Sequence, residues 1–211
     1  MCGRYTLHSK LKDILDKTAA VANTDISNSY NITPSSTIPV VRHQDKRELV
    51  NCHWGLIPHW TKDKKYKPIN ARAETINEKP FFRDAFKKKR CLIPGNGFYE
   101  WQGSKGHKQP YYIKLQDEEI FAFAGLWERW ESNDQIIESC TIITTEANET
   151  MAPIHHRMPV IINSSDYDQW LEQGGKDLLV PYAGDMISYL VSKKVNSPDN
   201  DGSELIQAIS H

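Results

Sequence analysis

Apolar residues in this chain gather in short runs that polar turns separate, and helical spacing is uncommon. Several runs are apolar at nearly every position, which is typical of strands buried on both faces of a sheet. The strands expected on this basis cover residues 90–94, 97–102, 111–115, 120–127 and 139–145. Two further runs, 38–43 and 48–54, flank a polar segment and predict a hairpin.

Helices are expected in only a few places. Leu11, Ile14 and Leu15 fall on one helical face. Ser9 stands just before them, where an N-cap residue is expected. A second short helix should follow residue 165 and turn three side chains inward, namely Tyr167, Trp170 and Leu171. Strands with occasional helices predict an α+β fold: one domain over residues 1–211, with a curved or barrel-like mixed, mainly antiparallel sheet and a few short peripheral helices.

The composition indicates where in the cell this protein is expected and whether it needs a metal or cofactor. The chain has 211 residues, of which 39% are hydrophobic and 25% charged, with a net charge of −1. Because no apolar run has the length of a membrane span and the first residues do not resemble a signal peptide, we expect a cytoplasmic protein with reduced thiols and no membrane partner. The four cysteines lack the paired spacing of a zinc site, so neither a metal nor another cofactor is expected. They are Cys2, Cys52, Cys91 and Cys140, of which Cys91 and Cys140 are expected in buried strands.

Local charge is more informative than net charge. Residues 79–90 hold six basic residues and one acid, interleaved with Phe81, Phe82 and Phe86. Residues 61–67 add four lysines shortly after Trp60. Basic and aromatic side chains together suit a phosphate backbone and unstacked bases. The alternative is a solvated helix face whose phenylalanines point into the core.

Cys2 directly follows the initiator methionine, so removal of Met1 would convert it into a 1,2-aminothiol. The amine can condense with an aldehyde to an imine, and the thiol can then close on the same carbon to give a thiazolidine ring. An α-amine titrates near ~8 and a thiol near ~8.5, so nearly neutral solution supplies some of both nucleophilic forms. Its position alone favours a cysteine without a catalytic role. Only the rest of the chain can show whether Cys2 is catalytic.

Three polar segments stand at expected strand ends and turns, where functional residues tend to lie. Residues 68–75 place an amide, Asn70, close to a guanidinium and a carboxylate. Glu100 interrupts an otherwise apolar strand, and His155 follows a buried strand and a turn. Each has a structural alternative: Asn70 as a turn former, Glu100 as a salt-bridged strand residue and His155 as a core histidine.

In combination and order, these segments resemble the SOS response-associated peptidase family, abasic-site processing proteins that protect single-stranded DNA. The resemblance spans nearly the whole chain and depends on the order and spacing of its motifs. The motifs are CGRY at 2–5, YNITP at 30–34, WGLIP at 54–58, NARAET at 70–75, GFYEW at 97–101, FAGLW at 123–127, TIITT at 141–145, IHHRMPV at 154–160 and VNSP at 195–198.

The resemblance implies an enzyme that loses Met1 and bonds covalently, through Cys2, to the ring-opened sugar of an abasic site. The implied peptidase activity is removal of the protein's own first residue. Glu100 and His155 match the family's proton-transfer residues. Asn70 matches a residue that orients Cys2 or the sugar. The implied partner is abasic single-stranded DNA, bound by a monomer that associates with the nucleoid when on DNA.

The implied DNA contacts are Arg4, Arg72 and Arg157 for phosphates and Trp60 as the stacking wedge. The chain departs from the family's pattern at two positions. Pro80 stands where some relatives carry a basic residue, so that contact is not carried over. His156 stands where relatives often have aspartate, and we expect it to lie outside the chemistry.

Two other functions remain open at this point. An N-terminal-nucleophile amidohydrolase or peptidase would use the Cys2 thiol on an amide, with Asn70 in an oxyanion hole. A non-enzymatic sensor of single-stranded DNA damage would use the same basic and aromatic residues with Cys2 idle. Acyl-enzyme formation identifies the first, and loss of the DNA complex in denaturing gels identifies the second.

Overall fold

A closed ring of strands forms the centre of the computed structural model, which describes residues 2–62, 64–104, 106–132 and 134–209. The ring consists of β4 (Thr37–His43), β5 (Arg47–Trp54), β7 (Arg90–Gly95), β10 (Phe121–Ser132) and β11 (Gln135–Glu146). Neighbouring strands pair antiparallel in the order β11, β10, β7, β4, β5. A short parallel pairing of β5 with β11 closes the ring, so the sheet is a mixed barrel.

Short strands extend this barrel at its edges. β6 (Asn70–Arg72) pairs parallel with β11, and β12 (Arg157–Pro159) pairs antiparallel with the same strand. β13 (Ile161–Ile162) joins β10, and β2 (Val21–Ala22) joins β5. The end of β11 therefore lies close to both β6 and β12, the two strands that carry polar motif residues.

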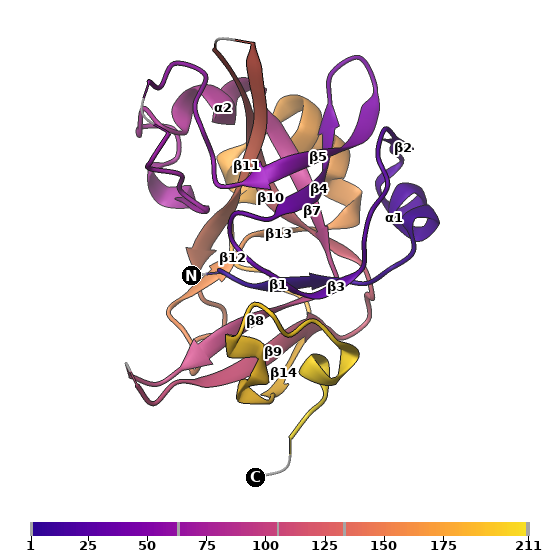
Figure 1. The fold of residues 1–211 in the computed structure, drawn as a ribbon, viewed down its shortest axis with the longest axis vertical. Helices are drawn as coiled ribbons and strands as arrows, with labels where there is room; N and C mark the ends of the chain where they lie inside the picture. Colours follow the sequence, from indigo (N-terminus) through magenta and orange to yellow (C-terminus); the bar gives the residue numbers. More distant parts are fainter. Residues whose placement is uncertain (1, 63, 105, 133, 210–211) are drawn as a thin grey trace.

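A second sheet lies below the barrel in the view of Figure 1. Its order is β14 (Met186–Leu190), β9 (Gln109–Leu115), β8 (Gly97–Gln102), β1 (Tyr5–Leu7) and β3 (Ser29–Ile32), all antiparallel. The α-helices are α1 (Leu11–Thr18) and α2 (Arg83–Lys88). Short helical turns complete the description: η1 (Ala73–Thr75), η2 (Ser164–Asp166), η3 (Gln169–Gln173), η4 (Lys176–Leu178), η5 (Lys193–Asn196) and η6 (Ser203–Ile206).

Aromatic side chains fill the space where β1 meets the barrel. The ring of Tyr5 contacts those of Trp54 and Phe123 edge to face, at centroid distances of 5.5 and 5.6 Å. Phe98 of β8 packs against Phe123 as well. All four side chains are fully buried. Because burial of one large apolar side chain contributes about 1.5–3 kcal/mol, this cluster holds the second sheet firmly on the barrel.

The fold class predicted from the sequence is confirmed. Every expected strand is present, including the hairpin of β4 and β5. β10 and β11 run further than expected because they continue as a hairpin past the apolar segments. The helical turns after residue 163 bury Tyr167, Trp170 and Leu171 as predicted, and Cys91 and Cys140 are buried strand residues. In the described part of the chain, no helix is long and apolar enough to cross a bilayer.

The N-cap assigned to Ser9 is wrong. Lys10 occupies the position before α1 and makes no side-chain cap hydrogen bond. Ser9 is buried, and its hydroxyl accepts a hydrogen bond of 2.7 Å from the Asn96 amide. Asn96 also accepts the backbone N–H of His8 at 2.7 Å. The Ser9 hydroxyl therefore bonds to Asn96 in the turn between β7 and β8, and not to the first turn of α1 as the sequence predicted.

The phenylalanines of residues 79–90 divide between the two expected settings. Phe82 and Phe86 pack against the core, as the structural alternative required. Phe81 instead makes edge contacts with Trp60 and Tyr66, at centroid distances of 5.7 and 5.2 Å. Trp60 and Tyr66 are 49% and 65% exposed, so this aromatic cluster faces solvent.

Gly97 tests how tightly β8 fits between its neighbours. A Cβ at this position would lie 2.2 Å from the Tyr112 hydroxyl and 2.8 Å from the backbone oxygen of Ile113. Tyr112 is buried and bonded to the Thr6 hydroxyl at 2.9 Å, so it has little room to move. We expect Gly97→Ala to lower the free energy of unfolding by about 1–3 kcal/mol, measured by urea denaturation.

Ser104→Ala is the control, because Ser104 is exposed in the turn after β8. Its effect should stay within about 0.5 kcal/mol. Equal stabilities of the two variants would contradict the close packing described for β8.

Candidate active site

The pairing of β1 with β8 brings the start of the chain to the buried strand that carries Glu100. The backbone N–H of Tyr99 donates to the carbonyl of Arg4 at 2.9 Å, and the two strands run antiparallel. Cys2, two residues before Arg4, therefore lies alongside Glu100. Cys2 is completely buried, and Glu100 is 3% exposed.

The thiol of Cys2 is held in its neutral form. Burial raises its pKa, and the negative charge of Glu100 raises it further. A hydrogen bond from the backbone of Arg4 acts in the opposite direction but is the weaker influence. Desolvation disfavours a thiolate wherever no cation compensates it.

His155 interacts electrostatically with the same carboxylate. It lies in the turn between β11 and β12, and Gln102 at the end of β8 donates to the backbone oxygen of Pro153 in that turn, at 2.8 Å. Burial lowers the pKa of His155, and the charge of Glu100 opposes this shift. Cys2 and His155 thus both interact electrostatically with Glu100.

The two adjacent histidines have different surroundings. The rings of His155 and His156 stack at a centroid distance of 4.4 Å and an interplanar angle of 24°. His156 is exposed, whereas His155 is half-buried. The charge of His156 contributes to the lowered pKa of His155.

Asn70 has polar side-chain atoms that find no partner in the described part of the chain. It begins β6, where it pairs with Ile142 of β11. Both the oxygen and the nitrogen of its side chain are buried and make no hydrogen bond within the described residues. The hydroxyls of Tyr5 and Thr141 have the same status. Buried polar groups are nearly always satisfied, so such groups are suited to meet a ligand.

Arg4 is engaged by the protein itself. Its Nη1 donates to Asn31 Oδ1 at 2.6 Å and to the carbonyl of Val195 at 2.7 Å. The guanidinium also lies 5.9 Å from the ring centroid of Trp101. Burial lowers the pKa of Arg4. These contacts tie the start of the chain to the VNSP motif near its end.

The other two arginines differ sharply in exposure. Arg72 ends β6 and is exposed, as a phosphate contact requires. Arg157 is only 9% exposed, and its guanidinium forms a two-pronged ion pair with Glu74, with Nη2 to Oε2 at 3.0 Å. Five of the eight predicted site residues therefore fall into two groups. Cys2, Glu100 and His155 are linked electrostatically, whereas Arg72 and Trp60 face solvent.

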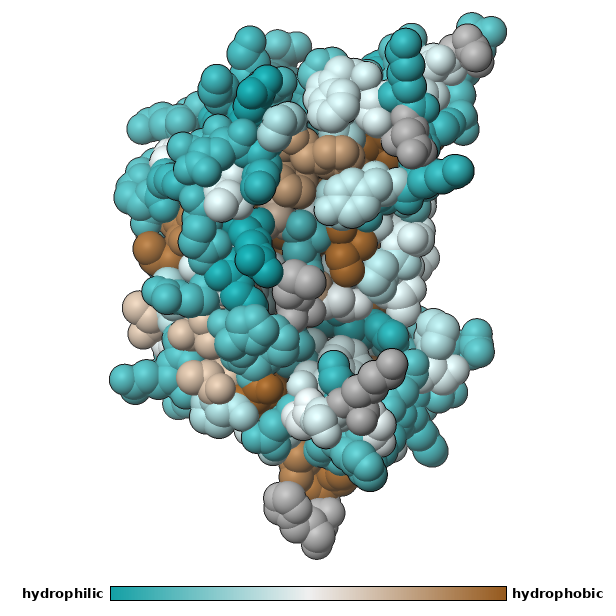
Figure 2. Space-filling view, turned by 90° about the vertical axis from the view of Figure 1, so that its left-hand side faces the viewer, coloured by the Kyte–Doolittle hydropathy of each residue, from teal (hydrophilic) through white to brown (hydrophobic). Residues whose placement is uncertain are grey.

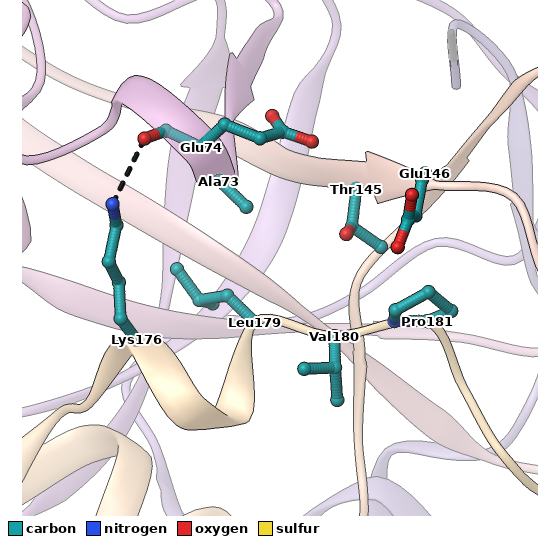
Figure 3. Close-up of a pocket in the computed structure, with 8 residues that line it drawn as sticks. All are labelled: Ala73, Glu74, Thr145, Glu146, Lys176, Leu179, Val180 and Pro181. Atoms are coloured by element: carbon teal, nitrogen blue, oxygen red, sulfur yellow. Dashed lines mark hydrogen bonds between the residues drawn. The ribbon is translucent and has the colours of Figure 1, made fainter.

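The cavity beside residues 70–75 does not include Cys2 in its lining. A cavity of about 290 Å³ lies next to Glu74 and is bordered by Glu146, Lys176 and Val180 (Figure 3). Figure 2 views the side on which β1 begins in Figure 1, and brown hydrophobic patches there are interrupted by teal hydrophilic side chains. Among the described residues, no cluster of histidine, cysteine and carboxylate side chains could hold a metal ion.

Sequence reasoning missed several residues that the structure groups with the predicted site residues. Glu74 was visible only as a carboxylate near Asn70, and its pairing with Arg157 spans 83 positions. Asn31 was visible only within a motif. Tyr66 stood among lysines with no signal that it would join Trp60 in one aromatic cluster.

Comparison with known proteins shows which family and which proteins this chain is similar to. Residues 1–198 match the family model described as SOS response associated peptidase (SRAP). The chain is 45% identical over 226 residues to the abasic site processing protein YoaM of Bacillus subtilis strain 168, and the alignment covers all of both chains. It is 34% identical to the abasic site processing protein HMCES of Xenopus tropicalis, over 86% of this chain and 66% of that protein.

Solved structures agree with the sequence comparison. A crystal structure of a protein from Bacteroides thetaiotaomicron superposes with a TM-score of 0.89 at 28% identity, covering 99% of this chain and all of that one. A protein from Bordetella bronchiseptica gives a TM-score of 0.80 at 26% identity, over 90% of this chain and all of that one. The chain therefore belongs to the SOS response associated peptidase family.

Proposed function

We propose that this protein processes abasic sites by binding single-stranded DNA and crosslinking Cys2, after loss of Met1, to the ring-opened sugar. The observation that carries the proposal is the convergence of Cys2 and His155 on the buried carboxylate of Glu100. The names of the relatives support abasic sites in damaged DNA as the target. We also propose that residues 1–211 act as a single domain and a monomer, in the cytoplasm and on the nucleoid when bound to DNA.

The chemistry requires several proton transfers. The closed sugar must first release its ring oxygen to expose the aldehyde. The Cys2 amine then adds to the aldehyde carbon and water leaves, which gives an iminium ion. Addition of the thiol to the same carbon, with loss of its proton, closes the thiazolidine ring. The net reaction joins protein and sugar with loss of one water.

The state of the thiol favours attack by the amine first. Burial and Glu100 raise the pKa of the Cys2 thiol, so a thiolate is scarce at neutral pH. An N-terminal-nucleophile amidohydrolase would have to remove the thiol proton in its first step, with the Cys2 amine as the base. Thiazolidine formation needs the thiol only in its second step, when Glu100 beside it can accept the proton.

The remaining polar residues then have distinct roles. Glu100 transfers protons at the sugar and at the Cys2 amine, and His155 exchanges a proton with the hydroxyl that leaves as water. Asn70 orients Cys2 or the sugar through a side chain that has no other partner in the described chain. Arg4, held by Asn31 and Val195, keeps the first residues in place.

The exposed aromatic cluster of Trp60, Tyr66 and Phe81 supports single-stranded DNA as the ligand. Its rings face solvent beside the exposed lysines of residues 61–67. Bases stack on such rings while basic groups follow the backbone. Tyr66 is four positions from Asn70, so at most about 14 Å of extended chain separates the cluster from the site.

Removal of Met1 is part of the proposal, because an amine in a peptide bond cannot attack an aldehyde. Met1 lies outside the described residues. In this account the peptidase activity consists of that single self-processing cleavage. The amidohydrolase and the passive DNA sensor remain outcomes of the experiments that follow.

Replacement of Cys2 tests the covalent step. Wild-type protein should form a heat-stable adduct with abasic single-stranded DNA in denaturing gels, and Cys2→Ala should not. Cys2→Ser should form a weaker imine or oxazolidine species, because its hydroxyl is a poorer nucleophile. Protein in which an inserted residue prevents Met1 removal should bind DNA but fail to crosslink. Wild-type yield from Cys2→Ala would exclude the aminothiol mechanism.

Glu100→Gln and His155→Ala separate chemistry from binding. Both variants should bind intact single strands nearly as well as wild type. Their single-turnover crosslinking should slow by about 10²–10⁴, the usual contribution of a positioned proton-transfer group, with Glu100→Gln the slower. Fluorescence anisotropy measures the affinity, and denaturing gels measure the rate. If Glu100→Gln lost affinity in proportion to its rate, we would withdraw its catalytic role.

The DNA-binding surface is tested by two variants with different signatures. Arg72→Ala should weaken binding and reduce the slope of log affinity against log salt by roughly 0.7, the value for one lost phosphate contact. Tyr66→Ala should weaken binding by about 1–3 kcal/mol without changing that slope, since stacking releases no counterions. Val21→Ala, at an exposed residue of β2, is the control. Affinity of Tyr66→Ala equal to that of the control would remove Tyr66 from the surface.

A further inference from the structure

The segment that carries Trp60 has no regular secondary structure of its own. It connects β5, which ends at Trp54, to β6, which begins at Asn70. Trp60 is 49% exposed and meets Phe81 edge to face. An exposed ring in such a loop keeps one orientation when its neighbours in the chain are held in place. Two side chains of β10 hold the residues on either side of Trp60.

Glu128 holds the residue before Trp60. Its side chain is 3% exposed, and its two carboxylate oxygens have different partners. Oε1 lies 3.3 Å from His59 Nδ1, and Oε2 accepts a hydrogen bond of 2.6 Å from the ammonium of Lys89. Moving His59 away would leave a buried carboxylate with one partner fewer, which is costly. His59 is therefore tied to β10.

Trp130 holds the residue after Trp60. Its indole N–H donates to the carbonyl oxygen of Thr61 at 2.8 Å, and Trp130 is 7% exposed. The ammonium of Lys64 lies 4.2 Å from the centroid of the same ring and also donates to Gln135 Oε1 at 2.9 Å. A buried indole N–H nearly always has a partner, so the carbonyl of Thr61 has little freedom to move.

These contacts come from one face of a regular hairpin. Glu128 and Trp130 are two positions apart in β10, so their side chains point to the same side of the sheet. Glu128 pairs with Ser139 of β11, and the Ser139 hydroxyl accepts the backbone N–H of Ile57 at 2.9 Å. In Figure 1 this hairpin rises beside α2 at the top of the molecule. The chain is thus attached to the hairpin on both sides of Trp60.

We propose that Glu128 and Trp130 are positioning residues that hold Trp60 in the orientation in which it stacks on a base of single-stranded DNA. The inference rests on the proposed function, in which the aromatic cluster of Trp60, Tyr66 and Phe81 stacks on bases. A loop that is ordered before binding avoids the entropic cost of ordering it in the complex. Both residues act through Trp60 and not at Cys2, so their replacement should change affinity and leave the chemical step intact.

Trp130→Phe is the principal test, because it keeps an aromatic ring beside Lys64 and removes the N–H that bonds to Thr61. Its affinity for intact single-stranded DNA should fall by about 3-fold to 10-fold, the cost of ordering one side chain on binding. The rate of crosslinking at saturating abasic DNA should stay at the wild-type value. Fluorescence anisotropy gives the affinity, and denaturing gels give the rate. A wild-type affinity would contradict the proposal.

Ile136→Ala is the matched control. Ile136 is 52% exposed and lies in the same hairpin, one position before the residue that pairs with Trp130, so its side chain points to the opposite face. This variant should bind DNA like wild type. Equal losses of affinity in Ile136→Ala and Trp130→Phe would mean that any change in the hairpin weakens binding, and the proposed role of Trp130 would be wrong.

A double-mutant cycle shows whether Trp130 acts through Trp60. Trp60→Ala alone should weaken binding, because it removes the stacking ring. Adding Trp130→Phe to Trp60→Ala should then cause no further loss, since an absent ring needs no positioning. A general loss of structure would instead lower the affinity by the same factor in both backgrounds, and that result would overturn the proposal.

Hydrogen exchange of the free protein tests the inference without DNA. The amide of Thr61 donates to the carbonyl of Pro58 at 3.1 Å, so exchange in this segment reports whether the loop is ordered. In Trp130→Phe and in Glu128→Gln, peptides that cover residues 57–62 should exchange about 3-fold to 10-fold faster than in wild type, while peptides from β8 should not change. Unchanged exchange at residues 57–62 in both variants would refute the inference.

Glu128→Gln keeps the size of the side chain and removes the charge that holds His59. It is followed by exchange alone, because a lost negative charge changes DNA affinity directly. If Trp130→Phe does not fold, Glu128→Gln decides whether β10 orders the loop.

These measurements separate this inference from the proposed function. Absence of a wild-type crosslink would refute the covalent function, and the exchange rates and the affinities for intact DNA would still test Glu128 and Trp130. If Trp60→Ala bound intact DNA as tightly as wild type, the inference would fail, while the crosslink through Cys2 would be unaffected.

Discussion

The antiparallel pairing of β1 with β8 is the constraint on which the site depends. Chain termini are usually mobile unless a sheet or a docked element holds them. Here the hydrogen bonds between the strands and the burial of Tyr5 against Trp54 and Phe123 fix the first residues of the chain. Cys2 consequently lies next to Glu100 before any ligand arrives. In the proposed mechanism, a nucleophile near the chain end thereby gains a fixed geometry from the sheet.

Burial determines the electrostatics of this site. The carboxylate of Glu100 lies where water is excluded, so its charge acts strongly on the Cys2 thiol and on His155. Burial and Glu100 raise the pKa of the Cys2 thiol, which suits the proposed mechanism, in which the amine attacks first. Asn70 at the start of β6 has buried polar side-chain atoms that make no hydrogen bond within the described residues, an arrangement that costs stability and suits the polar sugar of the proposed reaction.

The sequence predicted more of the strands than of their assembly. Apolar runs such as residues 90–94 and 139–145 sufficed because both faces of those strands are buried. The parallel pairing of β5 with β11, which closes the barrel, produces no pattern in the local sequence. Ser9 accepts a hydrogen bond from the distant Asn96 amide instead of capping the helix. For the proposed site, ordered motifs indicated Cys2, Glu100 and His155, which the structure brings together. They could not indicate the partner of Arg157, because that depends on contacts between residues far apart in the chain.

The most direct test of this account is the intact mass of the protein after it is mixed with abasic single-stranded DNA. The proposed mechanism gives one adduct whose mass is that of the protein without Met1 plus the DNA, minus one water. The bond should map to Cys2 and should be absent with intact DNA. A protein that retains Met1 and still forms the adduct, or an adduct that maps to another residue, would exclude crosslinking through the Cys2 aminothiol.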